Sequence, residues 1–359
     1  MRPRGGLLDF QATRTGPEPL RSNDSRAQAL RQFARNALAV SDLDIRPASA
    51  DASFRSYWRV TGNAPTRIVM DAPPDKEDIA PWLDVAARLR KAGVHAPEVL
   101  AVDRRHGFVL MEDLGTRTYL PELDDGSVDA LYADALDALL RMQSTVDVAG
   151  LPAYDRGRLV AEMELMPEWF LRRHLGFAPA CEEWDVIEAA FTFLVQAAQE
   201  QPRTFVHRDF HSRNLLVLER DGPGVIDFQD AVVGPLTYDL VSLLRDCYIE
   251  WDGERVEGWL ESHRQRLRHA HLLGIDVDLA RFRRWFDLVG LQRQIKVLGI
   301  FCRLWYRDGK PQYLADLPLV WRHALGVARR YPELADFASL LERALGERDI
   351  AQPRADAPA

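Results

Sequence analysis

The chain has little cysteine and no long apolar run. Its three cysteines, Cys181, Cys247 and Cys302, lie far apart and form no CxxC pair, so we expect neither a disulfide framework nor a zinc knuckle. No stretch reaches the roughly 18 uninterrupted apolar residues of a membrane span, and the N-terminus lacks the apolar core of a signal peptide. The sequence therefore predicts a cytoplasmic protein with no membrane association.

Positive charge is also scarce. The 46 Lys and Arg residues are outnumbered by 54 Asp and Glu, which gives a net charge of −8. Nonspecific nucleic-acid binding is therefore disfavoured, because it depends on neutralising phosphates with excess Lys and Arg. With 359 residues, of which 47% are hydrophobic, the chain is long enough for a large core and a cofactor-sized cleft. We expect a small-molecule ligand, and no segment points to an obligate protein partner.

The hydrophobic pattern changes near residue 115. The residues before it predict two helices, one that begins near Ser25 and one over 79–92. They also predict four strands, over 53–60, 67–70, 98–103 and 107–111. The residues after it predict mainly helices, among them 128–143, 159–174 and 183–200.

This division predicts an α+β fold with two lobes. The small N-terminal lobe, at 26–115, holds an antiparallel sheet, and the larger lobe, at 116–349, is mainly helical. Segment 1–25 is rich in Arg, Gly, Pro and Ser, and segment 350–359 is rich in Ala and Pro. We expect both to be flexible.

Residues 204–230 interrupt the helical pattern with a predicted hairpin over 214–228. Its loops carry Asp209 within the sequence His-Arg-Asp, then Asn214, then Asp227. Phosphoryl transfer from ATP needs one carboxylate at the acceptor hydroxyl, and a carboxamide and a second carboxylate that hold Mg²⁺. A single His or Asp is more often structural, but the joint spacing favours kinase chemistry.

Two longer segments extend this pattern to a family. HRDFHSRN and VIDFQDAVVGPLTYDLVSLLRD resemble the aminoglycoside/choline phosphotransferase branch of the protein-kinase-like fold. Within it, DASFRSYWRV, VMDAPP, FVLMEDLG and KVLGIFCRLWYRDGKPQYLADLP look like the bacterial anomeric N-acetylmuramate/N-acetylglucosamine kinases of cell-wall recycling. The resemblance spans roughly residues 28–335. It implies a bilobal kinase fold, ATP and Mg²⁺, an amino-sugar substrate and a sugar 1-phosphate product.

The resemblance also implies roles for the motif residues. Asp209 matches the catalytic base that orients the sugar hydroxyl, and Asn214 and Asp227 match the metal ligands. The same motif gives His211 and Arg213 as candidate substrate contacts.

Nucleotide contacts are expected from the first lobe. Ser53, Phe54 and Arg55 occupy the turn that covers the phosphates in this fold, although the turn lacks a GxGxxG sequence and could be an ordinary strand edge. Glu112 to Leu114 follows a strand and would present backbone groups to adenine, or could be only a polar turn.

One expected lysine is missing. Kinases usually carry a lysine on the third strand to hold the α- and β-phosphates, and Met70 stands at the matching position. Arg55 or another cation could substitute, phosphate binding could depend on Mg²⁺, or the chain could be an inactive, nucleotide-binding pseudokinase. The intact Asp209, Asn214 and Asp227 favour an active enzyme.

A basic helix is predicted over 288–307. Arg293, Lys296, Arg303 and Arg307 fall on one side of it. They could form a solvated face, or a positive wall for an anionic group such as the lactyl carboxylate of N-acetylmuramate. On the second interpretation Arg303 and Tyr306 contact substrate, and a polycationic aminoglycoside, the alternative acceptor, is disfavoured.

Overall fold

The computed structural model describes residues 25–50, 54–62 and 65–354. They divide into two compact units. The N-terminal unit contains the described residues of Met1–Ala86 and Pro97–Gly115, and the C-terminal unit contains those of Ala87–Ala96 and Thr116–Ala359. In the described ranges no helix is long and apolar enough to cross a membrane.

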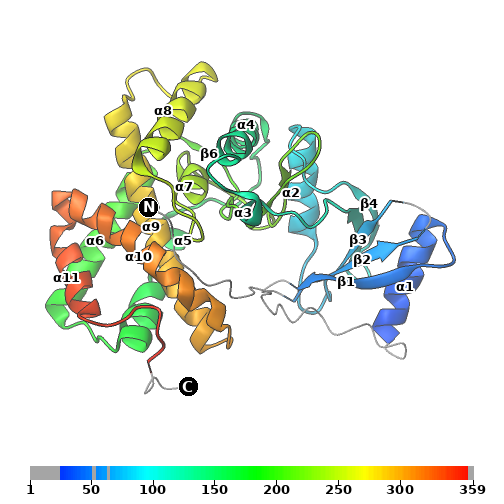
Figure 1. The fold of residues 1–359 in the computed structure, drawn as a ribbon, viewed down its shortest axis with the longest axis horizontal. Helices are drawn as coiled ribbons and strands as arrows, with labels where there is room; N and C mark the ends of the chain where they lie inside the picture. The colour runs from blue at the N-terminus through cyan, green and yellow to red at the C-terminus, as the bar shows by residue number, and fades with distance from the viewer. Residues whose placement is uncertain (1–24, 51–53, 63–64, 355–359) are drawn as a thin grey trace. The chain divides into compact units, whose positions relative to one another are not determined.

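An antiparallel sheet of five strands organises the N-terminal unit (Figure 1). Trp58 pairs with Val69 in the predicted hairpin, and Val69 pairs with Leu110 on its other side. The predicted small antiparallel lobe is therefore confirmed. The strand order is β1-β2-β3-β5-β4, with bounds β1 Asp44–Ala50, β2 Ser56–Thr61, β3 Arg67–Asp71, β4 Val99–Asp103 and β5 Phe108–Glu112.

The sequence pattern did not predict strand β1. The strand contains Pro47, which cannot donate to a neighbouring strand and is tolerated mainly at sheet edges. Its pairing with β2 is irregular between Pro47 and Ser49. An edge strand with this composition lacks the alternation of β2 and the apolar run of β3, so a prediction based on periodicity does not find it.

Helix α1, Ser25–Leu38, packs against this sheet. Its residues Leu30 and Ala34 are buried in one core with Trp58, Val69 and Phe108. The apolar positions recur at helical spacing, as expected from the sequence. Helix α2, Ala80–Lys91, also lies where it was predicted and ends before Gly93, whose φ of 75° suits a residue without a Cβ.

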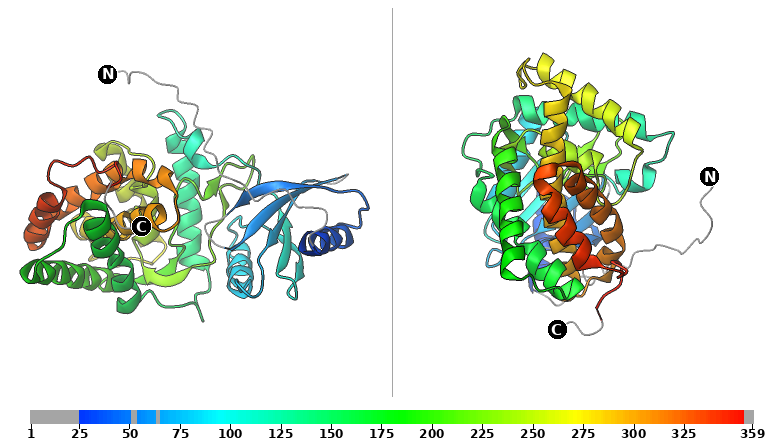
Figure 2. Two further views of the ribbon diagram at one scale, coloured as in Figure 1. Left: turned by 90° about the horizontal axis from the view of Figure 1, so that it is seen from below. Right: turned by 90° about the vertical axis from the view of Figure 1, so that its left-hand side faces the viewer.

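Helix α9, Leu279–Tyr306, is the principal helix of the C-terminal unit. It packs against η1, α10, α6 and α7 (Figures 1 and 2). This enclosure buries almost every side chain from Trp285 to Gly299. The other helices are α3 Tyr119–Glu122, α4 Val128–Thr145, α5 Arg156–Met163, η1 Met166–Leu175, α6 Cys181–Gln199, α7 Tyr238–Leu244, α8 Gly253–His269, η2 Pro311–Asp316, α10 Leu317–Arg330, η3 Pro332–Leu334 and α11 Ala335–Leu345.

The prediction of one continuous helix over 159–174 was wrong, because two helical segments lie there. The structure has α5 there, followed by η1, a π-helix that begins at Met166. Pro167 occupies the first turn of η1. Because proline has no N–H and its ring clashes with the preceding turn, a regular α-helix cannot continue through it.

Two short antiparallel pairs carry the predicted hairpin region. Strand β7, Leu215–Leu216, pairs with β8, Gly224–Val225, which confirms the hairpin. Strands β6, Arg203–Val206, and β9, Val232–Pro235, form a second pair that the sequence did not reveal. Because β6 precedes Asp209 and β9 follows Asp227, the β6–β9 pair fixes both ends of the segment that contains these two residues.

Candidate active site

His207 holds the loop that follows β6. Its imidazole is fully buried, and burial lowers its pKa to about 4, so the ring is neutral. The Nε2–H donates to the Ile226 carbonyl at 3.1 Å, and Nδ1 accepts the backbone N–H of Asp209 at 3.3 Å. His207 thereby ties the Asp209 loop to the residue that precedes Asp227.

Asp239, in the first turn of α7, fixes the same loop from the other side. Its carboxylate accepts the backbone N–H of His207 at 2.7 Å and that of Arg208 at 3.0 Å. Arg208 has a φ of 80°, a left-handed conformation that costs energy for a non-glycine residue. The two bonds to Asp239 stabilise this turn and set the direction of Asp209.

The structure brings Asp209, Asn214 and Asp227 together. The Nδ2 of Asn214 donates to the Asp209 carbonyl at 2.9 Å and to Asp227 Oδ2 at 3.3 Å. Gln229 donates to the other Asp227 oxygen at 2.9 Å. Asp227 also has a positive φ, 66°. A strained residue of this kind among polar side chains is typical of a functional site.

These residues suit a hard divalent cation. Mg²⁺ takes oxygen ligands, usually one or two from the protein and the rest from phosphates and water. Because Nδ2 of Asn214 makes both hydrogen bonds, its carboxamide oxygen is left to accept a cation beside the Asp227 carboxylate. The described residues contain no group of three or more His, Cys, Asp and Glu side chains that could form a metal site from protein ligands of these types alone.

Asp209 lies close to several positive charges. Burial raises the pKa of its carboxyl, but Lys296, His211 and Arg208 outweigh this effect and lower the pKa to about 2. Asp209 is therefore ionised at neutral pH and can accept a hydrogen bond from an acceptor hydroxyl.

Lys296 comes from α9 and is buried. Its Nζ lies 3.4 Å from the Tyr238 hydroxyl and 3.7 Å from Glu162 Oε1. Glu162 also pairs with Arg208 and accepts the hydroxyl of Tyr154. This Glu162 cluster connects α5, α7 and α9 behind the Asp209 loop. It holds two cations, Arg208 and Lys296, against one carboxylate, and both cations also act on the Asp209 carboxyl.

His211, Ser212 and Arg213 lie beside Asp209. Ser212 donates its N–H and its hydroxyl to Asp246 at 2.9 and 2.5 Å. The His211 ring meets Tyr248 edge-on with centroids 5.5 Å apart, and the Arg213 guanidinium stacks 3.5 Å above the same ring. The two candidate substrate residues of the motif therefore share one aromatic wall.

Arg303 and Tyr306 lie elsewhere. They follow Lys296 by seven and ten residues, which is about 10 and 15 Å along a helix axis. The Tyr306 hydroxyl bonds to His174 Nδ1 at 3.1 Å and accepts the backbone N–H of Arg354. The structure does not bring either residue to Asp209, and their substrate role stays a prediction.

The proposed solvated basic face is wrong for half of its members. Arg293 and Lys296 are buried, whereas Arg303 is partly buried and Arg307 is exposed and paired with Asp308. The physical reason is that neighbouring helices enclose α9 from Trp285 to Gly299, whereas its C-terminal end near Arg307 reaches solvent.

The other predicted site residues belong to the N-terminal unit. Phe54 is 65% exposed, an unusual state for a large apolar side chain, and Arg55 is buried 3.8 Å from Glu77. Glu112 ends β5 and its carboxylate accepts the Glu98 backbone N–H at 3.2 Å, while Leu114 is buried. Ser53 lies outside the described residues. Met70 lies in the third strand, β3, where the sequence analysis placed it, and it is buried.

Sequence reasoning missed Glu162 at this site. Arg293 and Lys296 had a signal, because they lie at helical spacing in a largely apolar helix, and the sequence analysis gave them as a solvated face or a positive wall. Glu162 had none, since an isolated acid on a predicted helix looks solvated until its tertiary neighbours are known.

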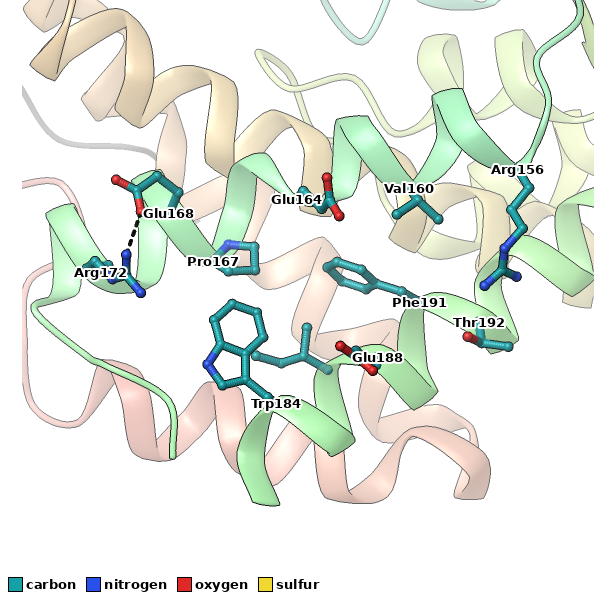
Figure 3. A pocket seen from close by; sticks show the side chains of 11 residues that line it. Arg156, Val160, Glu164, Pro167, Glu168, Arg172, Trp184, Glu188, Phe191 and Thr192 are labelled. Carbon is teal, nitrogen blue, oxygen red and sulfur yellow. Dashed lines mark hydrogen bonds and ion pairs between the residues drawn. The ribbon is translucent and has the colours of Figure 1, made fainter. Parts of the chain in front are cut away.

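A surface pocket of about 430 Å³ lies between α5–η1 and α6 (Figure 3). Trp184 and Phe191 form its apolar side, and Glu164 and Glu188 stand at its rim. None of the predicted site residues lines it. The chemistry at Asp209 is therefore assigned from the motif residues and not from this pocket.

Comparison with known proteins agrees with this geometry. Residues 44–273 match the phosphotransferase enzyme family. An N-acetylmuramate/N-acetylglucosamine kinase of Pseudomonas aeruginosa is 46% identical over 303 residues, which cover 84% of this chain and 89% of that protein. A kinase of the same name from Pseudomonas putida is 42% identical and covers 83% and 87%.

A solved structure shows the same fold. The GDP complex of aminoglycoside 2′-phosphotransferase-IIIa matches with a TM-score of 0.58 at 15% identity, over 86% of this chain and 100% of that one. At that identity the likeness concerns the fold alone. The kinase-like motif, the two-unit architecture and the extent of the sequence matches lead to one conclusion: this chain belongs to the phosphotransferase enzyme family.

Proposed function

We propose that this protein transfers the terminal phosphoryl group of ATP to the anomeric hydroxyl of N-acetylmuramate and N-acetylglucosamine. The new bond joins the anomeric oxygen to phosphorus, the bond to the β,γ-bridging oxygen breaks, and the products are a sugar 1-phosphate and ADP. The observation that carries the proposal is the convergence of Asp209, Asn214 and Asp227 in a chain whose relatives are named for these sugars.

The chain's residues have distinct parts in this reaction. The ionised Asp209 carboxylate accepts the hydrogen bond, and then the proton, of the acceptor hydroxyl. Asn214 and Asp227 would hold Mg²⁺, which supplies charge neutralisation at the β- and γ-phosphates. The Glu162 cluster holds the Asp209 loop without adding net negative charge beside the reacting oxygen.

Nucleotide binding is assigned to the N-terminal unit on the sequence resemblance. Phe54 and Arg55 are our candidates for phosphate contacts, and Glu112 to Leu114 for base contacts. With ATP as donor, we propose that the reaction takes place in the cytoplasm.

A product analysis tests the proposal. The full chain is incubated with MgATP and each sugar, and phosphorus NMR identifies the position of the new phosphate. We expect a 1-phosphate, no reaction with 1-O-methyl glycosides, and reaction of 6-deoxy analogues. A 6-phosphate, or turnover of an aminoglycoside with neither sugar used, would contradict the proposal.

A further inference from the structure

Arg213 has hydrogen-bonding capacity that no residue in the described part of the chain uses. Its guanidinium lies flat on Tyr248 at 3.5 Å, and about a third of the side chain is exposed. Its nearest charged partner is Asp316 Oδ2, at 3.8 Å, which is beyond hydrogen-bond distance. The N–H donors of a guanidinium lie in one plane and match a carboxylate, and contact of its face with an aromatic ring leaves these edge donors open to a ligand.

Asp316, the last residue of η2, is equally unsatisfied. Its side chain is 23% exposed, and no described residue donates a hydrogen bond to it. Burial raises its pKa to about 6, against the effect of Arg213, and the nearby Asp246 acts in the same direction as burial. A carboxylate in this state gains from donors that a ligand brings.

A third unsatisfied group lies on the same wall. His211 is 9% exposed, and its Nδ1 has no hydrogen-bond partner among the residues that the structure describes. Its ring contacts Tyr248, which stacks on Phe301, which in turn contacts Tyr313 of η2. Aromatic rings beside unused donors and acceptors are what a polar, ring-shaped ligand such as a sugar requires.

We propose that Asp316 determines the preference of the acceptor site between neutral and acidic amino sugars, by competing with the acceptor's carboxylate for Arg213. This inference rests on the proposed function. The loop from Asp209 to Asn214 carries Arg213, so an acceptor whose hydroxyl is at Asp209 has its other substituents near the Tyr248 wall.

The two sugars differ in charge, and Arg213 and Asp316 respond to charge in opposite ways. N-acetylmuramate carries a lactyl carboxylate and N-acetylglucosamine does not. A carboxylate on Arg213 would lie within a few ångströms of Asp316 and be repelled by it, whereas a neutral sugar would accept from Arg213 and donate to Asp316. Asp316 therefore favours the neutral sugar and Arg213 favours the acidic one.

The test measures a ratio, kcat/KM for N-acetylmuramate divided by kcat/KM for N-acetylglucosamine, at saturating MgATP. Asp316→Asn should raise this ratio about fivefold, because it removes the repulsion. Arg213→Gln should lower it about tenfold, because it removes the charge-assisted bond. The ratio is insensitive to damage at Asp209, which affects both sugars alike.

Two controls isolate charge from size and from general damage. The methyl ester of N-acetylmuramate keeps the lactyl group without its charge. Its kcat/KM divided by that of N-acetylglucosamine should be the same in Asp316→Asn, in Arg213→Gln and in the wild type. Glu250→Gln removes a carboxylate two residues after Tyr248 that pairs with the exposed Arg322 at 2.7 Å, and it should leave both ratios within twofold of wild type.

The outcomes separate this inference from the proposed function. If the wild type phosphorylates neither sugar, both fail. If it phosphorylates both sugars and Asp316→Asn leaves the ratio within twofold, only the present inference is overturned. Should Asp316→Asn fail to fold in a thermal melt, an unchanged ratio in Arg213→Gln overturns it equally.

Discussion

At the scale of single residues, the Asp209 loop shows how few groups define the chemistry. The His207 imidazole and the Asp239 carboxylate hold its backbone, and the Asn214 carboxamide connects it to Asp227. Three positive or polar neighbours keep the Asp209 carboxyl ionised. The loop therefore presents a charged oxygen in a fixed direction, which is the requirement for orienting a hydroxyl.

Asp209→Asn tests this role. The amide keeps the shape of the side chain but cannot accept a proton, so kcat should fall by at least about 10², while nucleotide affinity stays nearly unchanged. Steady-state kinetics and nucleotide titration measure the two quantities. A kcat near that of the wild type would remove Asp209 from the mechanism.

Asp316 predicts a pH dependence of stability. Its folded-state pKa of about 6 lies above the ordinary value of about 3.9, so the folded state binds the proton more tightly than the unfolded state. This contribution is fully present below about pH 4 and is lost as pH rises to about 6. Arg213 and Asp246 are the charged groups that act on it.

Urea unfolding of wild type and Asp316→Asn over this pH range measures the effect. The free energy of unfolding of the wild type, relative to the variant, should decrease from about pH 4 to 6 and then level off. Parallel curves for the two proteins would show that the carboxyl is not perturbed.

At the scale of elements, α9 brings the buried cations to the site because it approaches η1 closely. A Cβ built on Gly299 would lie 2.5 Å from the backbone carbon of Leu165 and 2.7 Å from its oxygen. Only glycine permits this spacing. Leu165 is three residues from Glu162, so the same contact sets the distance between Glu162 and Lys296.

Gly299→Ala should therefore separate the two helices. We expect a loss of about 1–3 kcal/mol in the free energy of unfolding, as for other overpacked contacts, together with a lower kcat. Gly326→Ala is the matched control, since nothing lies within 4 Å of a Cβ there in α10. That variant should be neutral or stabilised by up to about 1 kcal/mol. Equal effects of the two changes would contradict the close-approach argument.

At the scale of the whole molecule, each unit has its own core. Leu30, Trp58 and Phe108 belong to the core of the N-terminal unit, whereas α9 and the helices around it share another. In the N-terminal unit, Arg59 of β2 binds both oxygens of Asp113, at 2.6 and 3.0 Å, and the Gly115 carbonyl at 3.2 Å. This bidentate pair connects β2 to the segment after β5.

Arg59→Met should lower the stability of the N-terminal unit by about 1.5–3 kcal/mol, because Asp113 is left buried without its charged partner. Hydrogen exchange followed by mass spectrometry should show faster exchange in peptides from β2 and β5 and unchanged exchange in peptides from α9. Arg46→Met, which breaks an exposed pair with Asp44, is the control and should change neither. Uniform acceleration across the chain would contradict the assignment of the pair to one unit.

The sequence by itself determined the elements with strong periodicity and the catalytic motif. Strand β2 alternates and β3 is a short apolar run. Helices α1 and α2 repeat at helical spacing, and Asp209, Asn214 and Asp227 are close in the chain, so local physics was sufficient to predict them. The sequence did not predict strand β1 or the π-helix η1. Pro47 and Pro167 change the local hydrogen bonding of the backbone, and this effect leaves no periodic pattern in the sequence.

Only the tertiary structure decided which polar residues accompany the motif. Lys296 lies 87 positions after Asp209 in the chain and Asp316 lies 103 positions after Arg213, and no local periodicity relates residues that far apart. Their roles depend on burial and on the charges around them, and both are properties of the packed helices. The physical reason is that electrostatic effects act through space, so a lysine that looks solvated in sequence becomes a buried partner once α9 is enclosed.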